Sequence, residues 1–189
     1  MIDIKANAIR FKEIVKTNIH RDGIDQLMNW LDTTDFYTAP ASAHKHGAEP
    51  GGLCAHSLMV YNCLKKMQDN ESDESIAITA LFHDLCKVNF YKTSMRNTKD
   101  DSGRWIQVPY YETNTDDDFP LGHGEKSMYI INQYMKMSID EACAIRWHMG
   151  GYTLEQIYEK PQEMLALAKY KIVLKLQTAD AQADFWYNI

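Results

Sequence analysis

The chain has 189 residues, 45% of them hydrophobic and 24% charged, which is ordinary for one globular domain with a core of its own. It has no apolar run of about 18 residues that could span a membrane, no signal-peptide pattern, and four cysteines without a C-x-x-C pair, so we expect a cytoplasmic protein with reduced thiols. The net charge of -6 argues against sequence-independent binding of long nucleic acid, which requires many Lys and Arg side chains on phosphates.

The first part of the chain predicts helices. Residues 7–20 and 23–31 read as helices, the first of them amphipathic, and a loop rich in turn-forming residues follows them. Residues 54–68 predict a third helix, whose apolar residues fall on one stripe together with His56. Because that stripe should face the core, His56 should face it too.

The next helix is predicted to be the central one. Its segment, IAITALFHDLCK, is apolar nearly all round, as in helices buried in a core. Ser72, Asp73 or Ser75 could cap its N-terminus. Its two polar side chains, His83 and Asp84, come near its end.

The pattern then changes from helix to strand. Residues of about 90–112 combine a DSG turn with the alternating segment WIQVPYY, which predicts a small β-hairpin inserted between helices and followed by an acidic loop. Further helices are predicted at about 124–137, 139–149, 153–160 and 161–185, with Pro161 near the start of the last one. We therefore expect residues 1–189 to form a single domain.

Side chains that commonly bind metals lie on or at the ends of these largely apolar helices. A buried imidazole or carboxylate costs several kcal/mol unless a partner satisfies it. One or two bound cations would satisfy all of them at once. The residues are His56, His83, Asp84, His123, His148 and Asp180.

The motifs that carry these residues resemble those of the HD-domain metal-dependent phosphohydrolases, a family named for its His…His-Asp…Asp ligand set. The matching segments are GGLCAHSLMVY, ALFHDLCK, PLGHGEKS, IRWHMGG and KLQTADAQAD. Their order and spacing are similar to those in the HD domain of bacterial 3'-5' exoribonucleases of the YhaM type. The resemblance implies an all-α fold, an HD-domain helical bundle with the β-hairpin as an insertion.

The resemblance also implies a site for two divalent transition-metal ions, for which Mn, Fe, Co, Ni or Zn would be suitable. The first ion would be held by His56, His83, Asp84 and Asp180. Asp84 would bridge to a second ion, which His123 and His148 would also hold. Two such ions would generate a bridging hydroxide for the hydrolysis of a phosphate ester.

Substrate-binding residues are predicted around these ligands. Lys87 lies three residues after Asp84, a helical spacing that lets its ammonium reach the same face. Family members with an HD-x-x-K motif use this lysine near the substrate phosphate, so we assign catalytic roles to Asp84 and Lys87; the alternative is a solvated lysine near a helix C-terminus. His46, in the loop before His56, and Arg146 are further candidates for binding the substrate.

The resulting hypothesis is a phosphomonoesterase or phosphodiesterase that acts on a nucleotide or short oligonucleotide rather than on long nucleic acid. Two alternatives remain open. Some HD-domain proteins with a similar ligand set hold a di-iron centre and use O2, and a non-enzymatic nucleotide-binding sensor would also fit the fold. The complete ligand set favours an enzyme, because a structural metal site is usually closed by four ligands.

Overall fold

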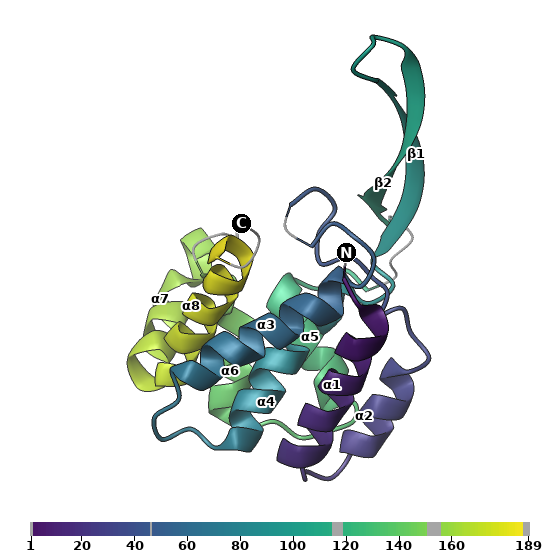
Figure 1. The fold of residues 1–189 in the computed structure, drawn as a ribbon. Coiled ribbons are helices and arrows are strands. Elements are labelled where there is room, and N and C mark those ends of the chain that lie inside the picture. The colour runs from purple at the N-terminus through teal and green to yellow at the C-terminus, as the bar shows by residue number, and fades with distance from the viewer. Residues whose placement is uncertain (1, 46, 115–118, 151–155, 187–189) are drawn as a thin grey trace.

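The computed structural model describes residues 2–45, 47–114, 119–150 and 156–186, and it shows a helical bundle from which a β-hairpin projects (Figure 1). This architecture agrees with the predicted helical domain with a hairpin insertion. No helix in the described part of the chain is long and apolar enough to cross a membrane. In chain order the elements are α1 (Ile4–Asn18), α2 (Ile24–Leu31), α3 (Gly52–Lys66), α4 (Asp73–Phe82), the 3-10 helix η1 (Leu85–Lys87), β1 (Tyr91–Lys99), β2 (Trp105–Thr113), α5 (His123–Asn132), α6 (Ile139–Trp147), α7 (Gln156–Lys169) and α8 (Lys171–Trp186).

Helices α3 and α4 form the centre of the bundle. Helix α3 contacts α1, α4 and α8, and both central helices contribute to two apolar clusters of the core. One cluster joins them mainly to α1, α2 and α5, and the other mainly to α6, α7 and α8. All residues from Ile76 to Phe82 are buried, which confirms the predicted central helix, and the Ser72 side chain caps it by accepting a hydrogen bond from the Ser75 N–H.

The central helix ends earlier than predicted. It was expected to continue through Lys87, but α4 ends at Phe82, His83 is its C-cap, and η1 follows Asp84. Asp84 has φ -107° and ψ 22°, outside the helical region. His83 and Asp84 are therefore not consecutive positions of one regular helix, and both side chains can face the same site.

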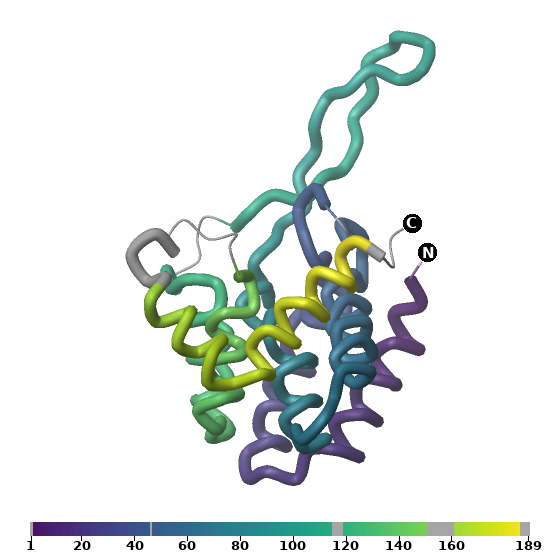
Figure 2. The backbone as a smooth tube through the Cα atoms, turned by 90° about the vertical axis from the view of Figure 1, so that its left-hand side faces the viewer, coloured from purple at the N-terminus to yellow at the C-terminus, as the bar shows by residue number. Residues whose placement is uncertain are grey.

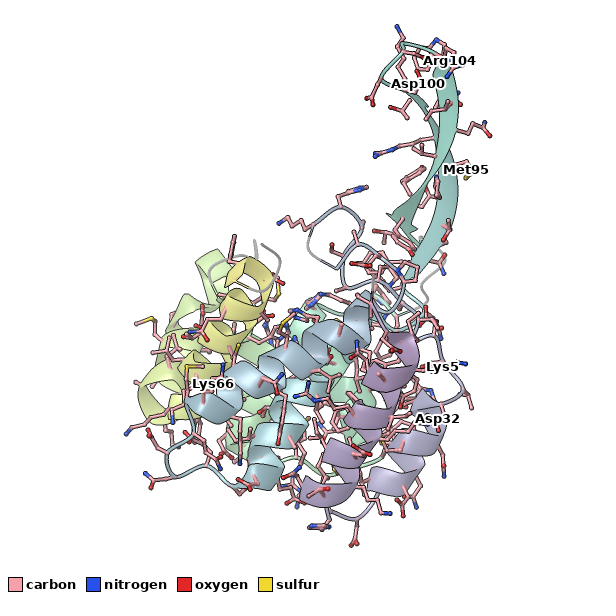
Figure 3. All side chains as sticks on the ribbon, viewed as in Figure 1. Lys5, Asp32, Lys66, Met95, Asp100 and Arg104 are labelled. Carbon is pink, nitrogen blue, oxygen red and sulfur yellow. The ribbon has the colours of Figure 1, made fainter. Side chains whose placement is uncertain are left out.

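The predicted hairpin lies between η1 and α5. Its strands are antiparallel, with Tyr91 opposite Thr113 and Lys99 opposite Trp105. The turn contains Gly103 at a φ of +79°, a conformation that glycine adopts at little cost. Two perpendicular views show that the ribbon stands away from the helices (Figures 1 and 2). Asp100 lies at its tip (Figure 3).

The C-terminal region differs from the prediction. The sequence predicted one helix over 161–185, but α7 ends at Lys169 and α8 begins at Lys171. The chain turns at Tyr170, where no Gly or Pro marks the break, and α7 packs against α8. Because the helical periodicity continues on both sides of Tyr170, periodicity alone predicts one helix where the structure has two. Pro161 lies inside α7, and the short helix predicted at 153–160 falls partly outside the described residues.

Candidate metal centre

The structure brings all the predicted ligand residues to one place, from separate helices. His56 is on α3, His83 and Asp84 follow α4, His123 begins α5, His148 is the C-cap of α6, and Asp180 is on α8. His83, Asp84 and His148 are each at most 2% exposed. Such burial of ionisable groups requires partners, and these residues provide them for one another.

A glycine brings two of these helices together. The α5 helix begins with His123 and Gly124, and a Cβ atom at position 124 would clash with the backbone oxygens of Ile145 and Arg146 at the end of α6. Because glycine has no Cβ, α5 can approach α6 closely. The His123 and His148 rings consequently lie with their centroids 5.3 Å apart.

A first group of donor atoms surrounds one oxygen of Asp84. His56 Nε2 lies 3.3 Å from His83 Nε2 and 3.0 Å from Asp180 Oδ1. Asp84 Oδ2 lies 3.7 Å from His56 Nε2 and 3.4 Å from His83 Nε2. These nitrogens and oxygens converge as ligands of a single cation would.

A second group surrounds the other oxygen of the same carboxylate. Asp84 Oδ1 lies 2.7 Å from His123 Nε2 and 3.5 Å from His148 Nε2. The two oxygens of Asp84 thus face two different sets of imidazoles. Each set contains enough nitrogen and oxygen ligands to hold a cation.

The orientation of two imidazoles fits metal binding. His83 Nδ1 lies 2.8 Å from the Ala80 carbonyl, and His148 Nδ1 lies 2.6 Å from the Ile145 carbonyl. A carbonyl can only accept, so each Nδ1 carries the hydrogen, and in the neutral ring Nε2 presents its lone pair to the site. The Nε2 atom of His148 is buried and has no hydrogen-bond partner among the described residues, although it faces a carboxylate. A cation between the two would satisfy both.

The electrostatics of the site also favour a cation. Burial alone would raise the pKa of Asp84, but the nearby charges of Lys87 and His83 and the hydrogen bond from His123 outweigh it and hold that pKa well below its usual value. Burial likewise disfavours a charge on His83, yet Asp84 and Asp180 raise its pKa to about 10. The carboxylates therefore remain ionised in a buried place and draw positive charge to themselves.

Five of the six predicted ligand residues, all except the fully buried His83, line a pocket of about 610 Å³. Lys87 lies in its wall, with Nζ 2.6 Å from Asp84 Oδ2 and a side chain that is 16% exposed. The alternative in which Lys87 is a solvated lysine near a helix C-terminus is therefore wrong, because its side chain is largely buried against Asp84. Sequence reasoning did not identify four other polar residues of this pocket, because single residues of these types carry no pattern; they are Ser42, Lys45, Tyr91 and Gln177.

The remaining candidates lie differently. Arg146 pairs with Glu125 and stacks on the Trp147 ring, with its guanidinium carbon 4.0 Å from the ring centroid, and it does not line the pocket. His46 is outside the described residues. Asp184, one turn after Asp180, does line the pocket, and its Oδ1 lies 3.5 Å from His56 Nδ1. It is therefore placed to orient the His56 ring through Nδ1, the nitrogen opposite the one that faces the other ligand groups.

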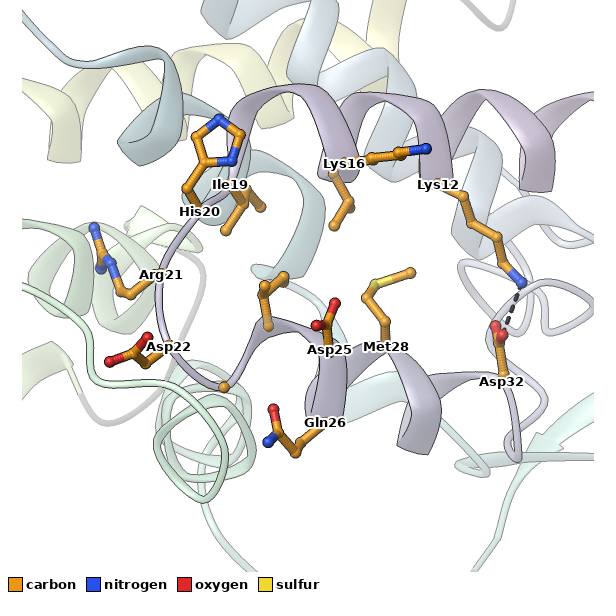
Figure 4. A pocket seen from close by; sticks show the side chains of 13 residues that line it. Lys12, Lys16, Ile19, His20, Arg21, Asp22, Asp25, Gln26, Met28 and Asp32 are labelled. Atoms are coloured by element: carbon orange, nitrogen blue, oxygen red, sulfur yellow. Dashed lines mark hydrogen bonds and ion pairs between the residues drawn. The ribbon is translucent and has the colours of Figure 1, made fainter.

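Another cavity, of about 840 Å³, lies between α1 and α2 (Figure 4). Its walls include apolar side chains such as Ile19 and Met28, and the Lys12–Asp32 ion pair lies at one end. None of the possible metal-ligand groups in the described part of the chain includes a residue of this cavity. The chemistry therefore concentrates in the pocket around Asp84.

Comparison with known families gives one result. The family model described as "HD domain" matches residues 53–179, about two thirds of the chain. The matched range contains His56, His83, Asp84, His123 and His148 and ends directly before Asp180. No curated protein and no solved structure matches the chain.

Proposed function

The chain belongs to the HD domain family, whose members are generally metal-dependent hydrolases, and from that premise we propose that it cleaves a phosphate ester of a nucleotide or short oligonucleotide. The division of the Asp84 carboxylate between two sets of imidazoles carries this proposal. A site that only stabilises a fold is usually closed by four ligands and needs no second set.

HD domains bind divalent metals, and the donors present here fit that role. We assign one ion to His56, His83, Asp84 and Asp180, and a second to Asp84, His123 and His148. Imidazole nitrogens and carboxylate oxygens suit Mn, Fe, Co, Ni or Zn. Divalent ions bound there would activate water and polarise phosphoryl oxygens.

The chain's own side chains position these donors and the substrate. Backbone carbonyls fix the hydrogens of His83 and His148 on Nδ1, so neither ring must reorient to bind. Lys87 holds Asp84 in place through its hydrogen bond and lies in the pocket wall, where its ammonium can also contact a phosphoryl oxygen. A pocket of about 610 Å³ is in the range of small-molecule sites, which supports a small phosphorylated substrate.

Metal analysis followed by an activity screen tests the proposal. The purified protein should hold close to two transition-metal ions per chain and, supplied with that metal, hydrolyse phosphomonoesters or phosphodiesters of nucleotides. His123→Ala should lower the metal content to about one ion, and His20→Ala, which removes an exposed histidine far from the pocket, should leave it unchanged.

Two results would contradict the proposal. A wild-type protein that binds only one ion with metal in excess would remove the second set of ligands. Two bound irons with oxygen uptake and no phosphoester cleavage would instead identify the oxidative alternative.

A further inference from the structure

No element in the described part of the chain covers the backbone edges of the hairpin. No residue from Tyr91 to Thr113 is buried, and β1 and β2 contact mainly each other. An isolated two-stranded ribbon is marginally stable in water, and its unpaired edges can pair with further strands. Its cations already have partners within the ribbon: Lys92 with Glu112, Arg96 with Tyr110, Lys99 with Trp105, and Arg104 with Asp100.

The hydrogen-bond pattern shows which backbone groups point outward. At the tip the Asp100 N–H donates to the Arg104 carbonyl, and at the base the Asn114 N–H donates to the Phe90 carbonyl. Bonded and non-bonded pairs alternate along an antiparallel ladder, so the even-numbered residues of the ribbon bond across it. The backbone N–H and C=O groups of the odd-numbered residues therefore face the outer edges.

The two outer edges differ. On β2 the outward-facing positions include Pro109, which has no N–H and lies in the middle of the strand. A proline on an edge opposes the addition of another strand. On β1 all five outward-facing residues retain their N–H groups; these are Tyr91, Thr93, Met95, Asn97 and Lys99. The β1 edge is thus open and the β2 edge is blocked.

We propose that the β1 edge pairs with the β1 edge of a second copy of this chain, antiparallel and with a twofold axis at Met95. In this register Met95 faces Met95 of the partner subunit, Thr93 faces Asn97 of the partner subunit, and Tyr91 faces Lys99 of the partner subunit. Every outward-facing residue meets another one, and each such pair can exchange two hydrogen bonds. The contact is isologous, as in most dimers.

The side chains of β1 are compatible with this self-pairing. Lys92 is opposite Thr98 of the partner subunit, and Arg96 is opposite Ser94 of the partner subunit, so no two like charges are directly opposed. Met95, which is 55% exposed and lies halfway along the strand (Figure 3), meets its own copy at the axis. A second copy fits this edge better than nucleic acid does, because the cations that would bind phosphates are already paired within the ribbon.

The arrangement separates the two helical bundles along the joined ribbons. A strand of nine residues spans roughly 30 Å, and antiparallel pairing places the two bundles at opposite ends of the joined ribbons. The tip of each hairpin then lies beside Tyr91 of the partner subunit. Because Tyr91 also lines the pocket around Asp84, the tip of one chain reaches the entrance of the other chain's pocket.

Disulfide trapping tests the register. Met95→Cys should form an intersubunit disulfide under mild oxidation, because hydrogen-bonded partners across a ladder have Cα atoms about 5.5 Å apart, within disulfide range. Asn97→Cys is the matched control: it faces Thr93 of the partner subunit and should not cross-link. Any cross-link through a native cysteine would also appear in the wild type.

A pair of proline variants tests the edge by sedimentation. Asn97 and Gln107 face each other across the hairpin, and both direct their N–H groups outward. Asn97→Pro should make the protein monomeric, whereas Gln107→Pro should leave the dimer intact. The interface is small, so the wild-type dimer should dissociate on dilution.

Several outcomes would overturn the proposal. In sedimentation, these are a wild-type protein that is monomeric at every concentration and equal effects of the two proline variants on the oligomeric state. In disulfide trapping, it is equal cross-linking of the two cysteine variants. A monomer whose Trp105 fluorescence changes on binding single-stranded RNA would also overturn it. Metal content and phosphoesterase activity are separate measurements, so failure here leaves the proposed function standing.

Discussion

The buried ion pair between Arg21 and Glu141 should stabilise the packing of two helices that carry metal ligands, although it lies far from the ligands themselves. Glu141, on α6, is fully buried, and Arg21 binds it with both terminal guanidinium nitrogens, Nη1 and Nη2, at 2.5 and 3.0 Å. Ser75 Oγ and the Ser138 N–H also donate to it, at 2.7 and 2.8 Å. These bonds tie the start of α6 to the start of α4, the two helices whose far ends carry His148 and His83.

Glu141→Gln should destabilise the fold without changing the ligands. The substitution replaces a carboxylate, which only accepts hydrogen bonds, with an amide. The NH2 group of that amide would face one or more of the donors that now bind Glu141. Breaking a buried ion pair costs about 3–5 kcal/mol. We reduce this to about 2–3 kcal/mol because the Arg21 side chain is 23% exposed and also binds Glu74. In a domain of this size the melting temperature should fall by about 5–10 °C.

The assay is urea unfolding of the variant and of a control as a function of pH. Asp32→Asn breaks an ion pair between two half-exposed side chains and should cost less than about 1 kcal/mol. Burial raises the pKa of Glu141, but the bonds from Arg21, Ser138 and Ser75 outweigh it and lower that pKa below its ordinary value. A lowered pKa stabilises the fold fully above the ordinary value, and this contribution is lost as the pH falls through the folded-state pKa. The difference between wild type and Glu141→Gln should therefore shrink in acid; equal stabilities at neutral pH, or parallel pH profiles, would refute the reasoning.

Three further predictions concern the pocket. Asp84→Ala should abolish metal binding and turnover together, whereas Lys87→Ala should keep the metal and lower kcat/KM by roughly 10- to 1000-fold; unchanged kinetics would remove Lys87 from the site. Asp184→Ala, which removes the carboxylate next to His56 Nδ1, should weaken metal affinity by about 10- to 100-fold. Titration with a competing chelator would measure this affinity, and an affinity equal to that of the wild type would contradict an orienting role for Asp184. Activity per phosphoester should be higher on nucleotides or oligomers of a few residues than on RNA tens of residues long, with a KM that changes little with salt; processive degradation of long RNA with a steep salt dependence would refute this.

The ligand set could be predicted from the sequence because each ligand is a polar residue in an apolar context. His83 and Asp84 interrupt a segment that is otherwise suited to the core, and burying them without partners would be costly. What the sequence could not show is how adjacent residues face one site. The helix ends at Phe82, and this break, which no Gly or Pro announces, lets both side chains point the same way.

The supporting contacts were less accessible to sequence reasoning. The segment from Ser138 to Glu141 carries the pattern of a capping box, and the structure contains one. The partner that makes Glu141 important, Arg21, is 120 residues away in the chain, and no local pattern links the two. Arg146 illustrates the converse: its charge and its position near His148 suggested a substrate ligand, but its guanidinium pairs with Glu125 and stacks on Trp147.

The position of the hairpin in the chain connects the two proposals. It is inserted between η1, which carries Lys87, and α5, which begins with His123, so its base is held by elements that form the pocket. Tyr91, the first residue of β1, lines that pocket and also lies at the end of the proposed intersubunit ladder. Pairing of two β1 edges would therefore fix the backbone at Tyr91 in each subunit. A dimer formed in this way would restrict the entrance of the pocket, which gives a physical reason for a small substrate that does not depend on net charge.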